Sequence, residues 1–499
     1  MMTNDGARLK LQELQDSIQT LWNMVTGAAE IGREAHEVEQ DLFRGVLTLG
    51  RQLLGAFFDI VGPGDLGETI ELPDGRRVRR LEHMSSRTYQ SVFGDFDIER
   101  WVYGTRAGQK IELVPTDQRL GLPKSEFSYL LQDWDQALGV EHAWNHVVDV
   151  IRRMLGVEQW VDSLERNSRQ MAEATEDFRD QLPPPEPAEE GGILVATVDN
   201  KGVPIRRPSD ALLPGARRKK GHKANKKRHA TLGGVYSVDP KIRTPEELVA
   251  ALFRDQPRRT SAIDPAAKQK RFRAALSDPD RNVHGQEETF RWLAEEVQRR
   301  RRPDQPLVYL TDGQRSLQTD RAKYLDVPGI VEILDFMHVI PRIWEAAYLF
   351  HREGSTQAEE FVRPRVLRIL RGEAAGVIKG LRRMGSTHEL PSVKRKTLQT
   401  ICRFLEQNLS RMRYDEYLAA GSPIASGVIE GACRHVIKDR MERSGMRWTV
   451  AGAQAMLDLR TIWINGYWRE FQEFRIAREH QRLYPHRKHF QRIPWQLAA

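Results

Sequence analysis

Residues 193–199 read ILVATVD, a short and mostly apolar run that ends on Asp199. Two later runs have the same form, LVYLTD at 307–312 and VEILD at 331–335. Short apolar runs bounded by turn residues are typical of buried strands. Strands that finish on aspartate deliver carboxylates to the edge of a sheet, where a divalent cation can bind them. The three runs therefore predict an α/β domain with an acidic edge.

A fourth acid, Glu430, stands far downstream, just after the helix-start signal Ser426-Gly427. Carboxylates gathered from distant parts of a chain are what a Mg²⁺-dependent phosphoryl-transfer enzyme needs, because Mg²⁺ prefers oxygen ligands. A single aspartate at the end of a strand is often only a turn or cap residue, so the interpretation depends on the combination. We expect Asp199, Asp312 and Glu430 to converge and bind Mg²⁺, with Mn²⁺ as a substitute.

The segment DFMH places Asp335 and His338 three residues apart, which is one side of a helix if the segment is helical. His338 could orient a carboxylate or contact a phosphate. The alternative, slightly favoured by spacing alone, is a neutral, hydrogen-bonded histidine in the core.

Helical spacing also predicts that Glu430, Arg434, Lys438 and Met441 share one helix face. A carboxylate with two cations along the same face fits a site for metal and DNA phosphate. The alternative is a solvated face held by ion pairs within the helix.

The composition of the chain changes on either side of the acidic runs. Residues 183–192 are rich in proline and predict a stiff linker. Upstream, a glycine turn at Leu155-Gly156 joins two helical stretches, as in a helix-turn-helix or in a helical pair packed for its own core. Downstream, ILVATVD and the following KGVPIRR are interpreted as two adjacent strands. The predicted organisation is a helical, dimerising region at 1–62, a small β unit at 66–120, a helical candidate helix-turn-helix region at 121–182, the linker at 183–192, a catalytic domain at 193–342, a helical insertion at 343–422, the last catalytic part at 423–475 and a basic tail at 476–499.

The bulk composition limits the classes of function. A chain of 499 residues is too long for one ordinary core. Its 77 Lys and Arg exceed its 69 Asp and Glu, a net charge of +8, and the clustering of this excess favours a polyanionic partner. The two cysteines, Cys402 and Cys433, are too few for a Cys-rich zinc module or a disulfide framework. No run approaches the length of a membrane span, so we expect a soluble, cytoplasmic protein.

The densest basic run is RRKKGHKANKKRH at 217–229, between two predicted strands. As a loop beside the acidic edge it would neutralise phosphates and give salt-sensitive DNA affinity; the alternative is a solvated loop. Shorter basic groups at 268–273 and 299–302 add further charge. The DNA contacts predicted in the run are Arg217, Arg218, Lys219, Lys220, Lys223, Lys226, Lys227 and Arg228.

Several of these segments together resemble one known family. The matching pieces are VATVDNKGVP around Asp199, LGGVYSVDP, VYLTDGQRSL around Asp312, LDFMHVIPRIW, SGVIEGACRHVIKDRMERSGMRW around Glu430, and GAQAMLDLR. In this order and spacing they resemble DDE transposases of bacterial insertion sequences of the ISKra type, with Mutator-like transposases as more distant kin. The resemblance covers residues 191–468.

The resemblance implies an RNase H-like mixed sheet with helices and an all-α insertion, beside a mostly helical N-terminal region. It implies cleavage at transposon ends and strand transfer by the freed 3′-hydroxyl, with Asp199, Asp312 and Glu430 as metal ligands. Carried over likewise, His338 would assist in the active site and Trp448 would contact DNA. Mutator-like kin often have Cys where Asp335 stands, so the resemblance assigns that residue no role.

The partners implied are double-stranded DNA, both as terminal inverted repeats and as target, recognised through the N-terminal helices. A homodimer or higher oligomer would form on this DNA, in a bacterial cytoplasm and at the nucleoid. Two other interpretations stay open: an RNase H-like nuclease or recombinase without strand transfer, and a catalytically inactive DNA-binding protein descended from a transposase. A helical scaffold would explain neither the acids nor the basic run.

Overall fold

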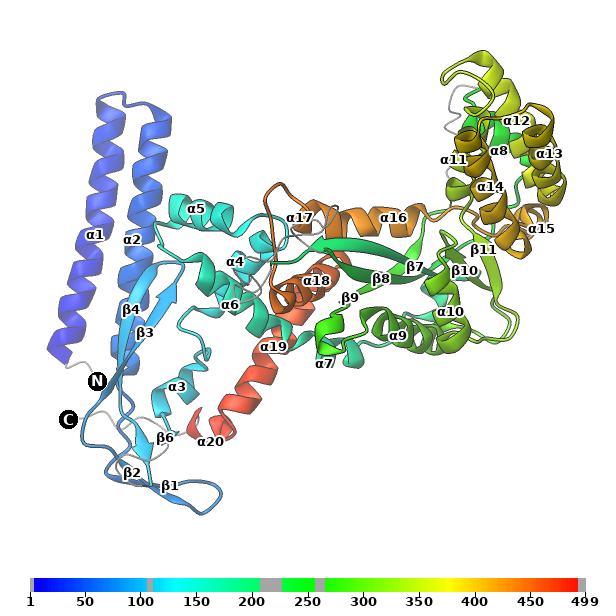
Figure 1. Cartoon of the computed structure of the whole chain (residues 1–499). Coiled ribbons are helices and arrows are strands. Elements are labelled where there is room, and N and C mark those ends of the chain that lie inside the picture. The colour runs from blue at the N-terminus through cyan, green and yellow to red at the C-terminus, as the bar shows by residue number, and fades with distance from the viewer. Residues whose placement is uncertain (1–3, 106–110, 207–226, 256–264, 492–499) are drawn as a thin grey trace, which may run out of the picture. The chain divides into compact units, whose positions relative to one another are not determined.

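The computed structural model describes residues 4–105, 111–206, 227–255 and 265–491. The chain forms two compact units (Figure 1). Unit 1 comprises residues 1–180 together with 467–499, and unit 2 comprises residues 181–466. The chain therefore leaves unit 1, builds unit 2 and returns. Among the helices in the described ranges, none has the length and apolar character needed to cross a membrane.

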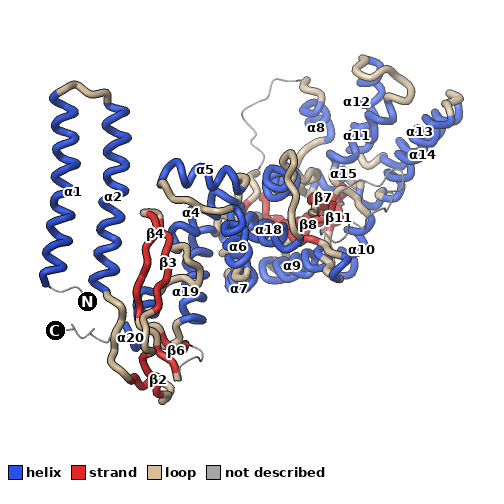
Figure 2. The backbone as a smooth tube through the Cα atoms, turned by 60° about the vertical axis from the view of Figure 1, so that its left-hand side comes forward, coloured by secondary structure: helices blue, strands red, loops and turns tan. Residues whose placement is uncertain are grey.

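Unit 1 begins with a helical hairpin, within the region 1–62 that the sequence predicted to be helical. Helices α1 (Asn4–Glu30) and α2 (Ala35–Val61) lie side by side in both views of the backbone (Figures 1 and 2). Lys10 of α1 forms an ion pair with Asp59 of α2, which ties the open end of the hairpin. Gly62 ends α2 with a φ of 73°, a conformation that glycine adopts without strain.

Two small sheets and a group of helices complete unit 1. The first sheet has the strand order β1-β2-β5-β6, with Gly75 (φ 84°) in the predicted turn between β1 and β2. The second is a ribbon of β3 and β4. The strands are β1 (Thr69–Glu71), β2 (Arg77–Arg80), β3 (Ser85–Ser91), β4 (Gly94–Arg100), β5 (Tyr103–Gly104) and β6 (Ile111–Leu113). The helices are α3 (Pro115–Leu120), α4 (Tyr129–Gly139), α5 (Trp144–Leu155), α6 (Val161–Ala172), α7 (Thr175–Gln181), α19 (Trp468–Leu483) and α20 (Arg487–Gln491).

The C-terminal end differs from the predicted domain boundary. Residues 476–499 were expected to form a basic tail after the catalytic domain, whereas α19 and α20 are helices of unit 1. Phe471 of α19 is fully buried, and its ring centroid lies 5.5 Å from that of Phe178. The helix belongs to unit 1 because its aromatic side chains complete the core of that unit.

Unit 2 is built on a five-stranded mixed sheet with the order β11-β10-β7-β8-β9. Strands β7, β8 and β9 pair antiparallel, whereas β10 and β11 run parallel to β7. The α/β class is confirmed. The strands are β7 (Ile193–Pro204), β8 (Lys227–Val238), β9 (Lys268–Leu276), β10 (Leu307–Thr311) and β11 (Val331–Leu334).

Two strands of this sheet differ from the prediction. The residues interpreted as two adjacent strands form the single strand β7, because its pairing with β8 continues without a break from Ile193 to Pro204. Strand β9 was not predicted, because the charged residues of KQKRFR in its first half interrupt the apolar pattern that indicates a buried strand. Arg271 is nevertheless buried, with its Nη1 3.1 Å from Glu296 Oε1.

Helices cover both faces of the sheet. Leu194, Ala196 and Val198 face α9 (Gly285–Arg300) and α10 (Arg315–Tyr324), whereas Val195 and Leu310 belong to the core under the helical insertion. Further helices of unit 2 are α8 (Pro245–Leu252), capped by Thr244, α16 (Gly427–Cys433), α17 (Asp439–Met441) and α18 (Val450–Ile464).

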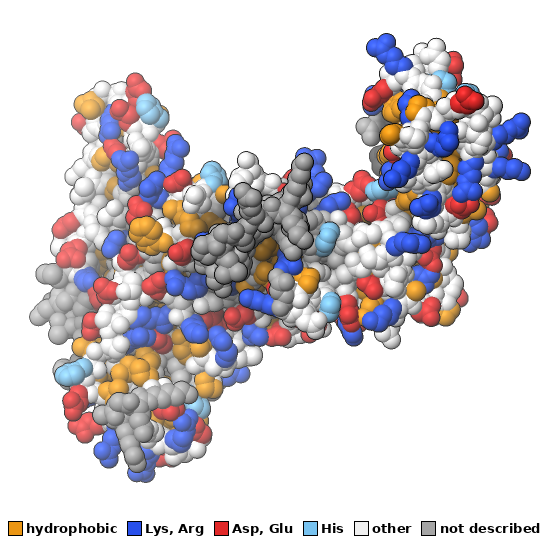
Figure 3. Space-filling view, in the orientation of Figure 1, with side chains coloured by type: hydrophobic (Ala, Val, Ile, Leu, Met, Phe, Trp, Pro, Cys, Tyr) orange, Lys and Arg blue, Asp and Glu red, His pale blue; other side chains and the backbone are white. Residues whose placement is uncertain are grey.

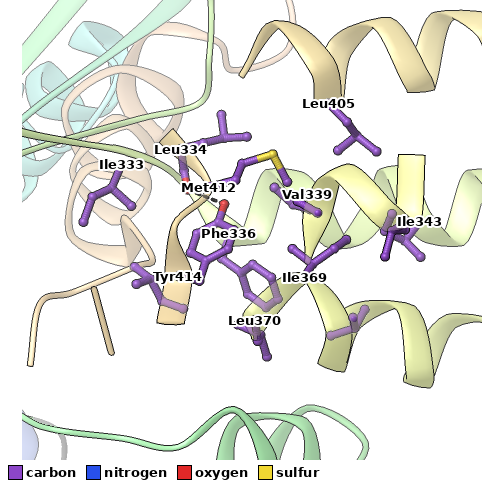
Figure 4. Packing of buried hydrophobic residues seen from close by; sticks show 14 of the residues in the cluster. Ile333, Leu334, Phe336, Val339, Ile343, Ile369, Leu370, Leu405, Met412 and Tyr414 are labelled. Atoms are coloured by element: carbon purple, nitrogen blue, oxygen red, sulfur yellow. Dashed lines mark hydrogen bonds between the residues drawn. The ribbon is translucent and has the colours of Figure 1, made fainter. Parts of the chain in front are cut away.

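Where a helical insertion was expected at 343–422, the structure has helices from Phe336 to Ala419. Figure 4 shows its core, in which Phe336 and Val339 pack with Leu405 and Tyr414. The Tyr414 hydroxyl donates a hydrogen bond of 2.7 Å to the carbonyl of Leu334, so the insertion is tied to the end of β11. The helices are α11 (Phe336–Ala347), α12 (Thr356–Leu370), α13 (Ala374–Thr387), α14 (Ser392–Gln407) and α15 (Tyr414–Ala419).

The predicted linker at 183–192 lies against unit 2 instead of spanning free space. Arg271 and Arg302 donate to the carbonyls of Pro183 and Pro187 at 2.6 and 2.9 Å. Irregular backbone leaves carbonyls without strand partners, and guanidinium groups satisfy them. Arg271 and Arg302, which belong to the basic groups at 268–273 and 299–302, therefore have structural partners. A contribution of these groups to DNA binding stays a prediction.

Candidate functional site

Three aspartates lie level with one another across neighbouring strands. Continuing the register between β7 and β10 by two residues pairs Asp199 with Asp312. Continuing the register between β10 and β11 by one residue pairs Asp312 with Asp335, so Asp312 lies between the other two. Neighbouring strands are about 4.8 Å apart. Asp199 shares its side of β7 with Val195, so it points to the face that the insertion covers. The acidic edge predicted from the three apolar runs is present.

Glu430 comes to the same face from the other end of the chain. It stands in the first turn of α16, as predicted, and α16 packs on β7 and β8. Its side chain is 50% exposed. One turn later, the buried Cys433 hydrogen bonds with Asp199, so α16 is anchored beside the acidic edge.

The closest group of candidate metal ligands is Asp335, His338 and Glu430. His338 Nδ1 lies 3.4 Å from Asp335 Oδ2 and 4.0 Å from Glu430 Oε1. Within the described ranges, one ligand atom from each of these residues lies within 4.8 Å of the other two, so the group could hold a metal ion. The His338 side chain is 41% exposed to solvent, which does not fit the alternative of a core histidine.

Asp335 is held in place from several directions. Its carboxylate accepts hydrogen bonds from the backbone N–H of Met337 at 2.8 Å and from the N–H and hydroxyl of Ser426. Burial raises the pKa of Asp335, but the bonds from His338, Ser426 and Met337 outweigh burial and lower it below 3.8. Asp335 is therefore a fully buried carboxylate that remains ionised.

His338 responds to the same charges with the opposite sign. Its hydrogen bond with Asp335 raises the pKa above 6.5, against the effect of burial, and the charges of Asp312 and Glu430 raise it further. The negative charges of Asp312 and Glu430 therefore both act on the imidazole of His338.

Lys201 is the counter-ion of Asp199. The two residues are two apart on β7 and share one side of the strand, with Lys201 Nζ 2.8 Å from Asp199 Oδ2. Burial lowers the pKa of Lys201, but Asp199, Cys433 and Asp312 raise it above 10.5. The ammonium of Lys201 therefore already lies beside Asp199 and interacts with the charge of Asp312.

The predicted ligands fall into two neighbouring groups. Asp199 and Asp312 lie side by side, whereas Glu430 has its short distances to Asp335 and His338. Sequence reasoning placed Asp335 at the acidic edge but left its role open, and it assigned no role in the site to Lys201 or Cys433. Lys201 lies two residues after Asp199 on the strand, and Cys433 lies three residues after Glu430 on the helix, so these spacings could have identified both.

The structure contradicts the role of Trp448 as a DNA contact. Its ring is 6% exposed, its Nε1–H donates to the carbonyl of Met441 at 3.2 Å, and the guanidinium of Arg440 lies 4.7 Å from the ring centroid. The ring is thus part of the core.

The predicted common face is wrong for Met441, whereas Glu430, Arg434 and Lys438 are all exposed. The chain forms a π-helix over Arg434–Lys438, which widens the turn and interrupts the four-residue repeat. Met441 is consequently fully buried while Arg434 and Lys438 are exposed.

Most of the predicted basic DNA contacts lie outside the described residues: Arg217, Arg218, Lys219, Lys220, Lys223 and Lys226. The remaining two residues of the basic run open strand β8 and have partners within the chain. Lys227 Nζ lies 2.6 Å from Glu442 Oε1, and Arg228 Nη2 lies 3.5 Å from Asp278 Oδ1. DNA binding by this run stays a prediction.

No protein-family model matches the chain, and no curated protein sequence matches it either. A function must therefore be argued from the chemistry of the site.

Proposed function

We propose that unit 2 is a divalent-metal-dependent enzyme that cleaves phosphodiester bonds. The observation that carries this proposal is the gathering of Asp199, Asp312, Asp335 and Glu430 beside one edge of the sheet. Carboxylates this close repel one another unless cations neutralise them. Lys201 offsets part of the negative charge, so the site favours further positive charge.

The donors fit Mg²⁺ or Mn²⁺. All four acids offer oxygen, the ligand that these hard cations prefer, and the buried Asp335 is already ionised. When bound, such an ion would polarise the phosphodiester and lower the pKa of an attacking water or 3′-hydroxyl.

Within this class we propose a DDE transposase with an RNase H-like catalytic domain. Three observations support it: a mixed sheet with adjacent acids, an all-helical insertion between Asp312 and Glu430, and the order of the sequence motifs that resemble the family. Asp199, Asp312 and Glu430 would bind the catalytic metal.

The residues around these ligands would position them. Ser426 and Met337 fix the Asp335 carboxylate, and Asp335 in turn orients the His338 imidazole toward Glu430. His338 would hold a proton at Nδ1 or release it as Glu430 takes up a cation. Lys201 would keep Asp199 paired until metal arrives.

The charge of the insertion supports a polyanionic substrate. Residues 343–422 carry 14 Lys and Arg against 9 Asp and Glu, a net charge of +5. On the face drawn in Figure 3, Lys and Arg side chains are spread over the region of α12 to α14. Such charge would bind DNA phosphates without reading sequence.

The test combines the purified chain with Mg²⁺ and labelled element ends and scores strand cleavage and joining separately. We expect Asp199→Asn, Asp312→Asn and Glu430→Gln each to reduce cleavage by more than the about 10- to 100-fold that loss of an outer-shell partner costs. The matched control is Glu345→Gln, an exposed acid on α11 paired only with Arg342 in the described contacts.

The outcomes separate the proposals. Cleavage without joining would identify a nuclease instead of a transposase. DNA binding without cleavage would identify an inactive relative. Full activity of any of the three acid variants would remove that residue from the ligand set.

A further inference from the structure

We propose that the α1–α2 hairpin packs against the same hairpin of a second copy of the chain, forming a four-helix bundle. The inference concerns unit 1 and does not depend on the proposed function. It starts from the contact between the two helices.

That contact defines an inner side on each helix. A Cβ on Gly45 of α2 would collide with Leu21 of α1, so the two backbones approach closely there. Lys10 and Asp59 meet at the open end, and Ala28 is buried near the closed end. These residues recur at heptad spacing, as in an antiparallel coiled coil.

Each helix also carries an exposed apolar stripe, displaced by about one residue from its inner side. The stripe consists of large side chains that are 39% to 63% exposed. Its members are Leu11, Ile18 and Trp22 on α1, and Leu42, Val46, Leu53, Phe57 and Ile60 on α2.

The two stripes lie on one face of the hairpin. One residue further along a helix is a rotation of about 100°. Because α1 and α2 run in opposite directions, the same rotation from their facing sides carries both stripes to the same side of the pair. The stripes therefore form one continuous apolar surface, which we call the hairpin face.

The other sides of the hairpin either pack against the chain itself or are polar. Phe58 of α2 packs against Tyr89 and Phe96 of the β3–β4 ribbon, with ring centroids 5.5 and 5.4 Å away. The side opposite the hairpin face is polar and includes the exposed Thr20 and Thr48. The hairpin face is thus the one large apolar side of the described hairpin that no other described part of the chain covers.

Its size suits a stable dimer. A helix of 27 residues is about 40 Å long, and two helices packed about 10 Å apart present a width of about 20 Å. The resulting area, on the order of 800 Å², equals the share that each partner contributes to a standard protein interface. Eight large, exposed apolar side chains lie within this footprint, and monomeric proteins rarely expose contiguous apolar patches larger than a few hundred Å².

The net charge of the hairpin indicates which kind of partner binds the hairpin face. Residues 10–61 carry four Lys and Arg against eight Asp and Glu, a net charge of −4, whereas the whole chain is +8. This acidic segment would repel DNA and anionic lipid. A second copy offers the same apolar face, and a twofold axis makes that face complementary to itself.

The experiment measures the mass of the DNA-free full chain at tens of micromolar by light scattering after size exclusion. We expect the wild type at twice 57.5 kDa. The double variant Val46→Glu/Leu53→Glu should run as a monomer, because it buries like charges in the bundle. The control Thr20→Glu/Thr48→Glu adds the same charge on the polar side and should remain dimeric.

Circular dichroism checks that each variant keeps its helices. If Val46→Glu/Leu53→Glu loses helical content, Val46→Gln/Leu53→Gln takes its place. A monomeric wild type overturns the proposal. So does a folded double variant that stays dimeric, or a control that dissociates to the same extent. None of these readouts involves DNA cleavage, so failure here leaves the proposed function untouched.

Discussion

Lys201 makes the clearest prediction at the scale of single residues. Its ammonium lies 2.8 Å from the Asp199 carboxylate and must give way if a metal ion binds there. Replacing it by methionine removes this competing charge while keeping most of the side-chain volume. We expect Lys201→Met to bind Mn²⁺ more tightly, on the order of tenfold, by calorimetric titration.

The control for this prediction is Lys268→Met, which removes a cation paired with Asp239 on the same sheet. It should leave Mn²⁺ affinity unchanged. Weaker or unchanged binding by Lys201→Met would mean that Asp199 is not a metal ligand.

The pair of Asp335 and His338 predicts a pH dependence. The pKa of His338 is raised above 6.5, so its contribution to stability is complete below about 6.5 and is lost as the pH rises through the folded-state pKa. The pKa of Asp335 is lowered below 3.8, so its contribution is present above that value and is lost as the pH falls through the folded-state pKa.

We therefore expect the His338 imidazole to titrate above 6.5 by NMR in the metal-free chain. Asp335→Asn should shift that midpoint down while keeping the shape of the side chain. A spectrum of His338→Gln assigns the resonance. An unshifted midpoint in Asp335→Asn would show that another group sets the pKa.

Three site residues could be predicted because each stands at a recognisable sequence boundary. Asp312 follows an apolar run, Asp199 follows another, and Glu430 follows a helix start. Burial and partners of single residues could not be predicted in the same way. Trp448 is in the core, which one aromatic residue in a charged segment does not reveal. From the sequence alone, Lys201 cannot be told from an ordinary surface lysine. Its pairing with Asp199 depends on strand β7 continuing past Asp199.

At the scale of elements, apolar pattern predicted four of the five strands of unit 2 and the helical insertion. It failed where charge interrupts the pattern. Strand β9 starts with KQKRFR, and its arginine at 271 is buried against Glu296. The end of apolar composition after Asp199 also suggested a strand end, although backbone pairing with β8 maintains the strand to Pro204.

The attachment of residues 183–192 depends on Arg300 of α9. Its side chain is fully buried, with Nε 2.8 Å from Glu190 Oε1 and Nη1 3.5 Å from Glu296 Oε1. Arg300→Met leaves the buried Glu190 carboxylate without its cation, whereas Glu296 keeps Arg271, and breaking a buried pair costs about 3–5 kcal/mol. We expect a loss of that size in urea denaturation of unit 2, together with new proteolysis at residues 182–190.

The control is Arg291→Met on the same helix, whose side chain is 61% exposed and paired with Glu287. An exposed pair contributes about 0–1 kcal/mol. Equal effects of the two substitutions would show that helix α9, and not the buried pair, determines the loss.

At the scale of the whole molecule, the sequence could not reveal that unit 1 is discontinuous. The stretch from 423 to 475 is uniformly helical and Trp-rich in sequence, so nothing marks Tyr467 as a boundary. Only packing distinguishes α18, which lies on β9, from α19, which lies on α7 through Phe178.

Truncation after residue 466 tests this organisation. We expect residues 1–466 to keep a folded unit 2 but to lose cooperative unfolding of unit 1, because Phe471 and Arg475 are buried parts of that unit. Hydrogen exchange would show fast exchange across α4 and α6 and unchanged protection in β7 and β10. Equal protection in unit 1 of both chains would make α19 dispensable.

The discontinuous unit also sets the order in which the protein can fold during its synthesis. Domains generally fold as they leave the ribosome, the N-terminal one first. Here the first 180 residues must wait until α19 has been translated, so the acid-bearing sheet of residues 193–334 is complete before the hairpin unit can be. A ribosome that stalls between codons 467 and 483 would leave a chain in which unit 2 is fully translated and unit 1 lacks a complete α19.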